Sequence, residues 1–171
     1  MIEIKADLIG SILDIGGGGE AVIGQIYGDN VLAIDISQEE LDEAPDCCQK
    51  QLMDARDLHF PDESFDNITF FYSLMYMTEK TQRKSILEAV RVLKSGGSIC
   101  IWDSDIDSAY PNPFVVHLDI CSGDSLIHTS YGIVKPGKQS SETILRFLKD
   151  AGISIASFQK EKGQFYIARK K

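Results

Sequence analysis

Ile12-Leu13-Asp14-Ile15-Gly16-Gly17-Gly18-Gly19-Glu20 is the stretch of sequence that decides the fold of this chain. The apolar run at its start is typical of a buried parallel strand. The four glycines predict a tight turn, because glycine tolerates a positive φ and a close approach by a ligand. Apolar residues at helical spacing follow, at Ala21, Val22, Ile23 and Ile26. A strand, a glycine turn and a helix start together predict a cradle of nucleotide size.

Strand and helix patterns alternate through the first two thirds of the chain. The strands are expected at 12–15, 31–35, 50–53, 66–72 and 98–102, and the helices at 20–27, 38–43 and 79–94. This order predicts an α/β fold, a Rossmann-like three-layer sandwich in which helices cover both faces of a mostly parallel sheet.

The last third of the chain has a different pattern. Segments 114–121 and 126–134 flank Ser122-Gly123-Asp124-Ser125 and predict a β-hairpin. A helix is expected at 140–151, and strands at 153–159 and 164–168 predict a closing antiparallel hairpin. We therefore expect one domain over residues 1–171, with an extra hairpin at 114–134 inserted after the fifth strand.

Composition narrows the class of function. The chain has 171 residues, is 43% hydrophobic, and carries a formal net charge of −9 from 26 acidic and 17 basic residues. This charge disfavours nucleic acid as a partner, because phosphate binding needs a basic surface. No apolar run approaches the roughly 18 residues of a membrane span, and the start of the sequence lacks a signal-peptide pattern. A cytoplasmic location is expected. The four cysteines do not have zinc-ligand spacing, so no metal is predicted.

Two interpretations of the glycine turn compete. Gly16, Gly18 and Ala21 match the dinucleotide pattern G-x-G-x-x-G/A, and Asp35 lies about 20 residues on, where a ribose-binding acid is expected. Taken alone, this match points to a nicotinamide-dependent oxidoreductase.

Five motifs, in order, match a different family. They are Asp14-Ile15-Gly16-Gly17-Gly18, Asp35 after the second strand, Asp54-Ala55 after the third, Phe60-Pro61-Asp62-Glu63-Ser64-Phe65-Asp66, and Leu93-Lys94-Ser95-Gly96-Gly97. With them the chain resembles the class I S-adenosylmethionine-dependent methyltransferases. The resemblance implies that S-adenosylmethionine is the cofactor, with a carboxylate on the ribose hydroxyls and an acid with the next backbone N–H on the adenine. It implies these cofactor-binding residues: Asp14, Gly16, Gly17, Gly18, Asp35, Ile36, Asp54, Ala55 and Tyr72.

Electrostatics favours the second interpretation. Asp14 and Glu20 would repel the pyrophosphate of a dinucleotide, whereas S-adenosylmethionine carries a sulfonium and an ammonium. Opposite charges about 4 Å apart attract by about 4 kcal/mol at an effective dielectric near 20. The carboxylate of the methyl donor is expected to accept from free N–H groups of the turn.

The chain departs from the family in three places, the third of which is the added hairpin at 114–134. Glu20 stands where the family often has a third glycine, and about eleven residues precede Ile12, where the family usually has helices that cover the methyl donor. We expect the hairpin at 114–134 to replace that cover or to pair two subunits as a homodimer, because it leaves the carboxyl end of the fifth strand, where acceptors bind.

The sequence assigns no catalytic residue. Methyl transfer from a sulfonium needs mainly alignment and desolvation, so a dedicated base is optional. Tyr72 or Tyr76 could orient an acceptor, although packing of the pocket wall is the simpler role. Asp103, Asp105 and Asp107 are expected to form a solvated acidic loop in preference to a divalent-metal site.

Three functions stay open. The first is a methyltransferase acting on a small molecule. The second is a non-catalytic module or partner subunit that binds S-adenosylmethionine, and the third is the NAD-dependent oxidoreductase.

Overall fold

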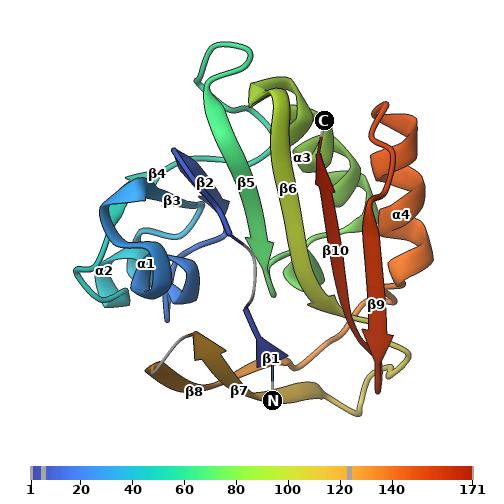
Figure 1. Cartoon of the computed structure of the whole chain (residues 1–171). Coiled ribbons are helices and arrows are strands. Elements are labelled where there is room, and N and C mark those ends of the chain that lie inside the picture. The colour runs from blue at the N-terminus through green and yellow to red at the C-terminus, as the bar shows by residue number, and fades with distance from the viewer. Residues whose placement is uncertain (1, 5–6, 123–124, 171) are drawn as a thin grey trace.

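The computed structural model describes residues 2–4, 7–122 and 125–170. Its main element is a seven-stranded sheet with the order β4-β3-β2-β5-β6-β10-β9. The strands are β2 (Ile12–Ile15), β3 (Val31–Asp35), β4 (Gln49–Leu52), β5 (Phe65–Phe71), β6 (Leu93–Ser104), β9 (Ser157–Glu161) and β10 (Gln164–Lys170). Figure 1 shows α3 and α4 behind this sheet and α1 and α2 beside its β3 and β4 side.

The sheet is parallel from β4 to β6 and antiparallel at its C-terminal edge. Three of the parallel pairs, β2–β3, β2–β5 and β3–β4, are in regular register, as in Ile12 opposite Val31 and Leu13 opposite Ile68. The fourth, β5–β6, has a register shift between Phe65 and Asn67. β10 returns antiparallel beside β6, and β9 pairs antiparallel with β10. The predicted Rossmann-like architecture with a closing antiparallel hairpin is confirmed.

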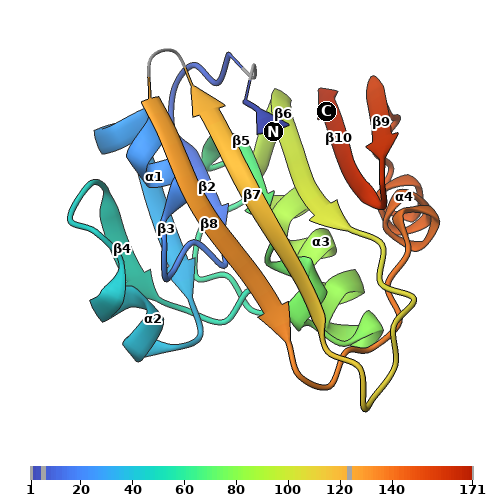
Figure 2. The same ribbon diagram turned by 90° about the horizontal axis from the view of Figure 1, so that it is seen from below.

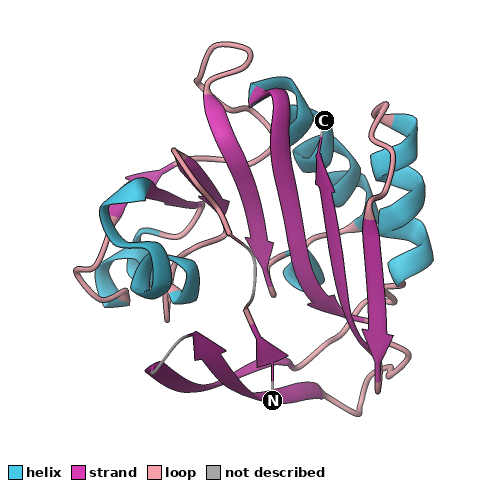
Figure 3. Cartoon of the chain, in the orientation of Figure 1, coloured by secondary structure: helices cyan, strands magenta, loops and turns pink. Residues whose placement is uncertain are grey.

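Helices cover the sheet where the apolar periodicity predicts them. They are α1 (Val22–Tyr27), α2 (Gln38–Glu43), α3 (Glu79–Val92) and α4 (Ser141–Asp150), with short 3₁₀ turns η1 (Gly28–Asn30) and η2 (Leu74–Tyr76). Side-chain caps fix three of the starts, because Ser37, Thr78 and Ser140 each accept a hydrogen bond from the backbone N–H three residues on. Figure 3 shows the helices in cyan against the magenta sheet.

Several predicted bounds are wrong by a few residues, and each has a local cause. α1 begins at Val22 instead of Glu20, because Ala21 has a φ of 46° and extends the turn. α3 ends at Val92 instead of Lys94, because Leu93 is extended and pairs with Phe65.

Two strand bounds shift for similar reasons. β9 begins at Ser157 instead of Ile153, whose N–H instead donates to Leu148 at the end of α4. β6 extends to Ser104, beyond the predicted Trp102, because β10 is long enough to pair with it.

Two apolar cores lie on opposite faces of the sheet, because successive strand residues alternate in direction. One core joins the sheet to α3 and α4 and contains Leu13, Ile68 and Ile99. The other joins it to α1 and contains Ile12, Val22 and Trp102. Asp14 follows the parity of Ile12, so its side chain lies on the α1 face.

A second sheet, which the sequence analysis did not predict as a unit, packs on the α1 face. β7 (Phe114–Ser122) and β8 (Ser125–Ile133) form the predicted antiparallel hairpin, and β1 (Ile2–Glu3) adds to β7 in parallel. The predicted turn residues Gly123 and Asp124 lie outside the described residues. Figure 2 shows the hairpin crossing the carboxyl ends of the parallel strands.

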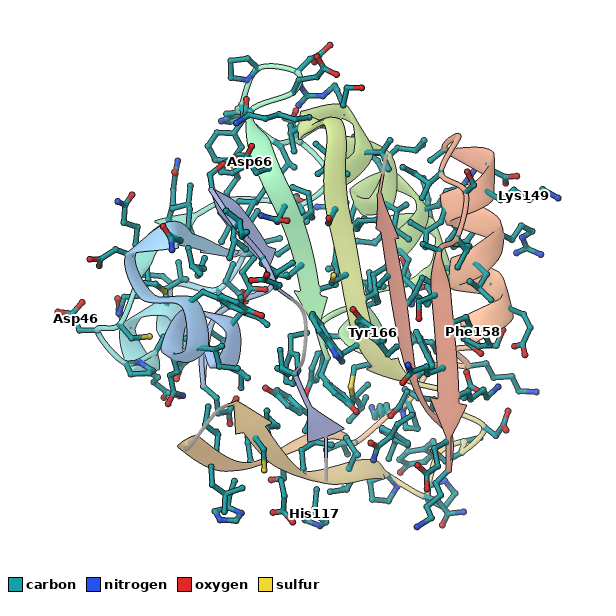
Figure 4. All side chains as sticks on the ribbon, in the orientation of Figure 1. Asp46, Asp66, His117, Lys149, Phe158 and Tyr166 are labelled. Carbon is teal, nitrogen blue, oxygen red and sulfur yellow. The ribbon has the colours of Figure 1, made fainter. Side chains whose placement is uncertain are left out.

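The inner face of the hairpin is apolar and buried. Val116, Leu118 and Ile120 belong to the same core as Trp102. The side chain of His117 lies on the outer face and points away from the sheet (Figure 4). The hairpin therefore covers the edge at which a bound nucleotide is expected.

Asp66, near the start of β5, links this strand to Ser11 and Lys94 at the end of the sheet away from the glycine turn (Figure 4). Its carboxylate accepts hydrogen bonds from the backbone N–H and the hydroxyl of Ser11 at 3.0 and 2.8 Å, and from Lys94 at 2.9 Å. These contacts lower the pKa of Asp66 to about 2. The segment that resembles the family's lead-in to this strand thus has a structural task here.

Candidate methyl-donor site

The glycine turn sits at the carboxyl end of β2, and three of its glycines are closely packed by other parts of the site. Gly16 has a φ of 76°, and a Cβ there would collide with Ser73 after β5. A Cβ on Gly17 would lie 2.5 Å from Asp14 Oδ2, and one on Gly18 would lie 2.6 Å from Glu40 Cβ. Any side chain at these positions would displace its neighbours, so the turn requires glycine for reasons of space.

The N–H groups of the turn have partners within the protein. Gly16 and Gly17 donate to the carbonyl of Ile34 at 2.8 and 3.0 Å. Gly18 donates to Asp35 Oδ2 at 3.3 Å, and Gly19 to the carbonyl of Glu40 at 2.8 Å. The expectation that these N–H groups are free for the carboxylate of a ligand is therefore wrong. They brace the turn against β3 and α2.

Asp14 is a buried acid, and among the described residues only one of its two carboxylate oxygens accepts a hydrogen bond. Its side chain is 2% exposed, and Oδ1 accepts from the Thr69 hydroxyl at 2.6 Å. Oδ2 is the oxygen beside Gly17. Burial raises the pKa of Asp14 to about 7, against the lowering effect of the Thr69 hydrogen bond, and nearby Asp35 adds to the rise. No ion pair to a lysine or arginine partners this carboxylate among the described residues. A cation placed here would favour the charged carboxylate and lower its pKa.

Asp35 and Ile36 follow β3 on the other side of the turn. The Asp35 carboxylate links two backbone segments, because it accepts hydrogen bonds from the N–H of Ser37 at 2.9 Å and from the N–H of Gly18 at 3.3 Å. Its oxygens still have lone pairs for further donors. Ile36 is 68% exposed, unusually so for a large apolar residue beside a site. The pair offers a carboxylate and an apolar surface next to each other.

Asp54 and Ala55 follow β4 at the same edge of the sheet. Asp54 forms a bidentate ion pair with Arg56, with Nη2 to Oδ2 at 2.5 Å and Nε to Oδ1 at 2.9 Å. Arg56 lowers the pKa of Asp54. Ala55 is half-buried and packs on the α3-side core. The Arg56 partner was not predicted, and it engages the side chain that the resemblance assigns to adenine.

Two further carboxylates add negative charge around the turn. Burial and the charges of Asp35, Glu43 and Glu20 all raise the pKa of Glu40. Burial raises the pKa of Tyr131 on β8, and the charges of Glu20, at the end of the turn, and Asp14 add to the rise. The field around the glycines is therefore strongly negative, which favours a cationic ligand and disfavours a pyrophosphate.

The hairpin reaches over this site through Tyr131. Its ring stacks on Tyr72, with centroids 5.2 Å apart and planes 6° from parallel. Tyr72 is 1% exposed and has a φ of 51°. Next to the pair, the Tyr76 hydroxyl accepts from the backbone N–H of Gly132 at 3.3 Å. Tyr72 is among the residues that the sequence predicts at the site, whereas Tyr131 is not, because it lies 59 positions away and no spacing pattern links the two.

Asp103, near the end of β6, and Asp105 and Asp107, which follow the strand, do not form the expected solvated loop. Asp103 is buried and accepts hydrogen bonds from Ser104 N, Met75 N and Gln139 Nε2. Burial raises its pKa to about 7. Asp105 pairs with Lys160 and accepts from Ser141 N at the start of α4, and Asp107 alone is exposed.

These aspartates hold structure together. The amide of Gln139 donates to Asp103 and accepts a hydrogen bond from the amide of Gln82, which also donates to the carbonyl of Leu74 in η2. Across residues 2–4, 7–122 and 125–170, no group of three or more histidines, cysteines and carboxylates is arranged to hold a metal ion. In the same ranges no helix is long and apolar enough to cross a membrane.

Comparison with known proteins agrees with this geometry. Residues 13–101, which contain the turn, Asp35 and Asp54, match the model of a methyltransferase domain family. The match covers more than half of the chain, and the chain belongs to this family, the class I S-adenosylmethionine-dependent methyltransferases.

Individual relatives are more distant. The chain is 26% identical over 159 residues to the O-methyltransferase resE of Aspergillus sclerotiorum, covering 86% of this chain and 56% of that protein. It spans about half the length of the curated relatives it matches.

Solved structures share the fold. An S-adenosylmethionine-dependent methyltransferase from Methanosarcina mazei has a TM-score of 0.68 at 18% identity, covering 94% of this chain and 92% of that one. The [4+2]-cyclase SpnF has a TM-score of 0.64 at 25% identity, covering 88% and 54%.

Proposed function

We propose that this chain binds S-adenosylmethionine at the glycine turn and transfers its methyl group to a hydroxyl of a small molecule. The observation that carries the proposal is Asp14, a buried carboxylate beside Gly17 with a pKa raised to about 7 and no cationic partner among the described residues. A ligand with an ammonium group supplies the missing charge.

The residues around the turn fit such a ligand. Asp14 would hold its ammonium, and Asp35 would accept from the ribose hydroxyls with the lone pairs that Ser37 and Gly18 leave free. Ile36 and Ala55 would flank the adenine. Asp54 would act as an acceptor from within its ion pair with Arg56, which keeps it charged. Tyr72 would contribute to the wall of the site.

The acceptor class is inferred from charge and from relatives. Nucleic acid is disfavoured by the net charge of −9 and by the carboxylates around the turn. The matched curated relatives are named O-methyltransferases, which favours a hydroxyl as the acceptor. When bound, S-adenosylmethionine supplies an activated methyl group on a sulfonium. The protein's task is to align the acceptor and exclude water, for which Tyr131 and Tyr72 are placed.

We further propose that the whole chain acts as one domain in which the hairpin is the cover of the site. Two contacts hold the hairpin over the carboxyl ends of the parallel strands. They are the stack of Tyr131 on Tyr72 and the hydrogen bond from the N–H of Gly132 to the Tyr76 hydroxyl. The outer face of the hairpin exposes Val115 and Leu126, which leaves a homodimer through this face as its alternative use. A cytoplasmic location stays a prediction.

A radiolabel assay tests the activity. The chain is incubated with methyl-labelled S-adenosylmethionine and a panel of phenols, alcohols, carboxylic acids and amines, and label is followed into the product. Transfer to a hydroxyl compound that is lost in Asp14→Asn is the expected result. Transfer to amines alone would contradict the assigned acceptor.

A second candidate is a domain that binds S-adenosylmethionine without transferring its methyl group. The stack of Tyr131 on the fully buried Tyr72 favours it, because this contact occupies the acceptor side of the site. A nucleotide-binding methyltransferase fold also serves other chemistry, since one structural neighbour is named a cyclase. Binding of S-adenosylhomocysteine without transfer to any member of the panel would select this candidate.

A further inference from the structure

Cys47 and Cys48 are adjacent thiols outside the proposed methyl-donor contacts. They lie in the bend between α2 and β4, and both are half-buried and free. Cys48 also packs on the apolar core at the α1 face. Two neighbouring cysteines can act together on one ligand when their sulfur atoms converge.

The two sulfur atoms do converge, on Gly24 of α1. The point where a Cβ of Gly24 would stand is 2.5 Å from Cys48 Sγ and 3.1 Å from Cys47 Sγ. Both sulfurs therefore lie within a few ångströms of each other, on the same side of the helix. The absence of a side chain at Gly24 makes room for them.

The chemical state of the pair selects the kind of ligand. Burial, followed by the neighbouring Cys47, raises the pKa of Cys48 to about 12, so Cys48 is a neutral thiol at pH 7. A divalent metal needs deprotonated thiolates and further ligands. A trivalent arsenical needs neither, because its oxygen takes up the thiol protons and leaves as water.

We propose that Cys47 and Cys48 form a dithiol site that captures a trivalent arsenical across both sulfur atoms and thereby weakens the methyl-donor site. An organic arsenic oxide, R–As=O, reacts with two thiols to form R–As(SR)₂ and one water. Two As–S bonds form, the As=O bond breaks, and both thiol protons leave in the water. Arsenic remains trivalent and no oxidant is needed.

The weakening follows from the contact with α1. An arsenic atom bridging the sulfurs needs space where Gly24 now packs, so α1 must move. α1 follows the glycine turn, and its Val22 and Ile23 share the core with Cys48. A displaced α1 shifts the turn that carries Gly17 and Gly18. This second half of the proposal rests on the proposed function.

The experiment uses phenylarsine oxide with the whole chain and four variants. Intact-mass spectrometry measures the adduct, calorimetry measures S-adenosylhomocysteine affinity, and hydrogen exchange measures protection of residues 16–27. Cys47→Ser and Cys48→Ser each remove one thiol of the pair. Cys121→Ser and Cys100→Ser are matched controls, since these cysteines lie on β7 and β6.

The expected result is one adduct per chain, equal to the arsenical minus one water, in the wild type and both control variants but in neither Cys47→Ser nor Cys48→Ser. S-adenosylhomocysteine affinity should fall about fivefold or more, exchange over 16–27 should rise, and a small dithiol should reverse both effects.

Each other result overturns part of the proposal. An adduct that persists in Cys47→Ser or Cys48→Ser, or none in the wild type, overturns the dithiol site. An adduct that leaves exchange over 16–27 unchanged overturns its coupling to the turn. If the untreated chain fails to bind S-adenosylhomocysteine, the proposed function is wrong, while the mass and exchange readouts still judge this proposal.

Discussion

Tyr131 of β8 lies flat on Tyr72 at the end of β5, with ring centroids 5.2 Å apart and planes 6° from parallel. The contact joins the hairpin to the edge of the sheet where the glycine turn emerges. Because Tyr72 is buried and held in a left-handed conformation, we expect Tyr131 to be the partner that moves. Closing and opening of the site should therefore depend on this ring.

Replacing Tyr131 tests the hairpin as a cover. Tyr131→Ala should speed release of S-adenosylhomocysteine by about fivefold, because a stacked aromatic pair contributes about 1 kcal/mol beyond its buried area. Tyr131→Phe keeps the ring and should change release little. Stopped-flow fluorescence with displacement by unlabelled ligand gives the rates.

The matched control for the hairpin is His117→Ala, because His117 is exposed on its outer face. It should leave the release rate unchanged. Equal rates in Tyr131→Ala and the wild type would show that the hairpin does not cover the bound nucleotide.

Asp14→Asn should raise the free energy of unfolding of the unliganded protein and lower its affinity for S-adenosylhomocysteine. The native state holds a proton on Asp14 up to about pH 7, whereas the unfolded chain loses it near pH 3.8. The free energy of unfolding of the unliganded protein therefore falls through this group as the pH rises from about 4 to 7. Asparagine removes that cost and still accepts from Thr69, so Asp14→Asn should be more stable by about 1 kcal/mol or more at pH 8. Urea unfolding measures the change.

The same variant should lose at least about thirtyfold in S-adenosylhomocysteine affinity, because removal of one partner of a buried ion pair costs about 2 kcal/mol or more. Asp103→Asn is the contrasting variant. The pKa of Asp103 is also raised, yet both of its carboxylate oxygens accept hydrogen bonds from N–H groups. In Asp103→Asn the side-chain NH₂ would face one of these N–H donors, and the protein should be less stable. A less stable Asp14→Asn, or one that binds with full affinity, would contradict the assigned role.

Binding should depend on pH with a definite sign. Below about pH 7, Asp14 is protonated and must lose its proton before it can pair with an ammonium group. The affinity for S-adenosylhomocysteine should therefore rise with pH between about 5.5 and 7 and level off above. Calorimetry in buffers of different ionisation enthalpy should detect proton release at pH 6. In Asp14→Asn the affinity should be low and independent of pH in this window, and a flat wild-type profile would refute the model.

Gly18→Ala should disrupt the site without a large effect on the fold. The new Cβ would stand 2.6 Å from Glu40 Cβ and 3.0 Å from Asp35 Oδ2, so Asp35 must move. We expect an affinity loss of about tenfold or more, since a displaced charged hydrogen bond costs about 1.5 kcal/mol or more. Gly137→Ala is the control, because nothing lies within 4 Å of its Cβ position. Equal loss in both variants would point to general destabilisation.

Local sequence patterns predicted the strands of a mostly parallel sheet, its antiparallel closing hairpin and the acids at the ends of its strands. The apolar strand before Gly16 and the acid at Asp35 each depend on neighbours close in sequence, and their placement is confirmed by the parallel register of β2 and β3. Helix starts at Ser37, Thr78 and Ser140 follow from capping, which is also local.

What the sequence could not reveal depends on contacts between distant segments. Tyr72 stacks on Tyr131, and β7 pairs with β1, more than a hundred residues earlier, in addition to its predicted partner β8. Asp103 resembled a solvated acid because its neighbours are acidic, and its burial arises from Gln139 and η2. The use of the turn's N–H groups by Ile34 is likewise a tertiary contact that glycine spacing does not encode.

The most direct measurement is a calorimetric titration of the wild-type chain at pH 8 with S-adenosylhomocysteine and, separately, with NAD. The negative field of Asp14, Glu20, Asp35 and Glu40 predicts one-to-one binding of S-adenosylhomocysteine and no heat from NAD. Saturable binding of NAD with no response to S-adenosylhomocysteine would contradict the assignment of the glycine turn to a cationic, phosphate-free nucleoside.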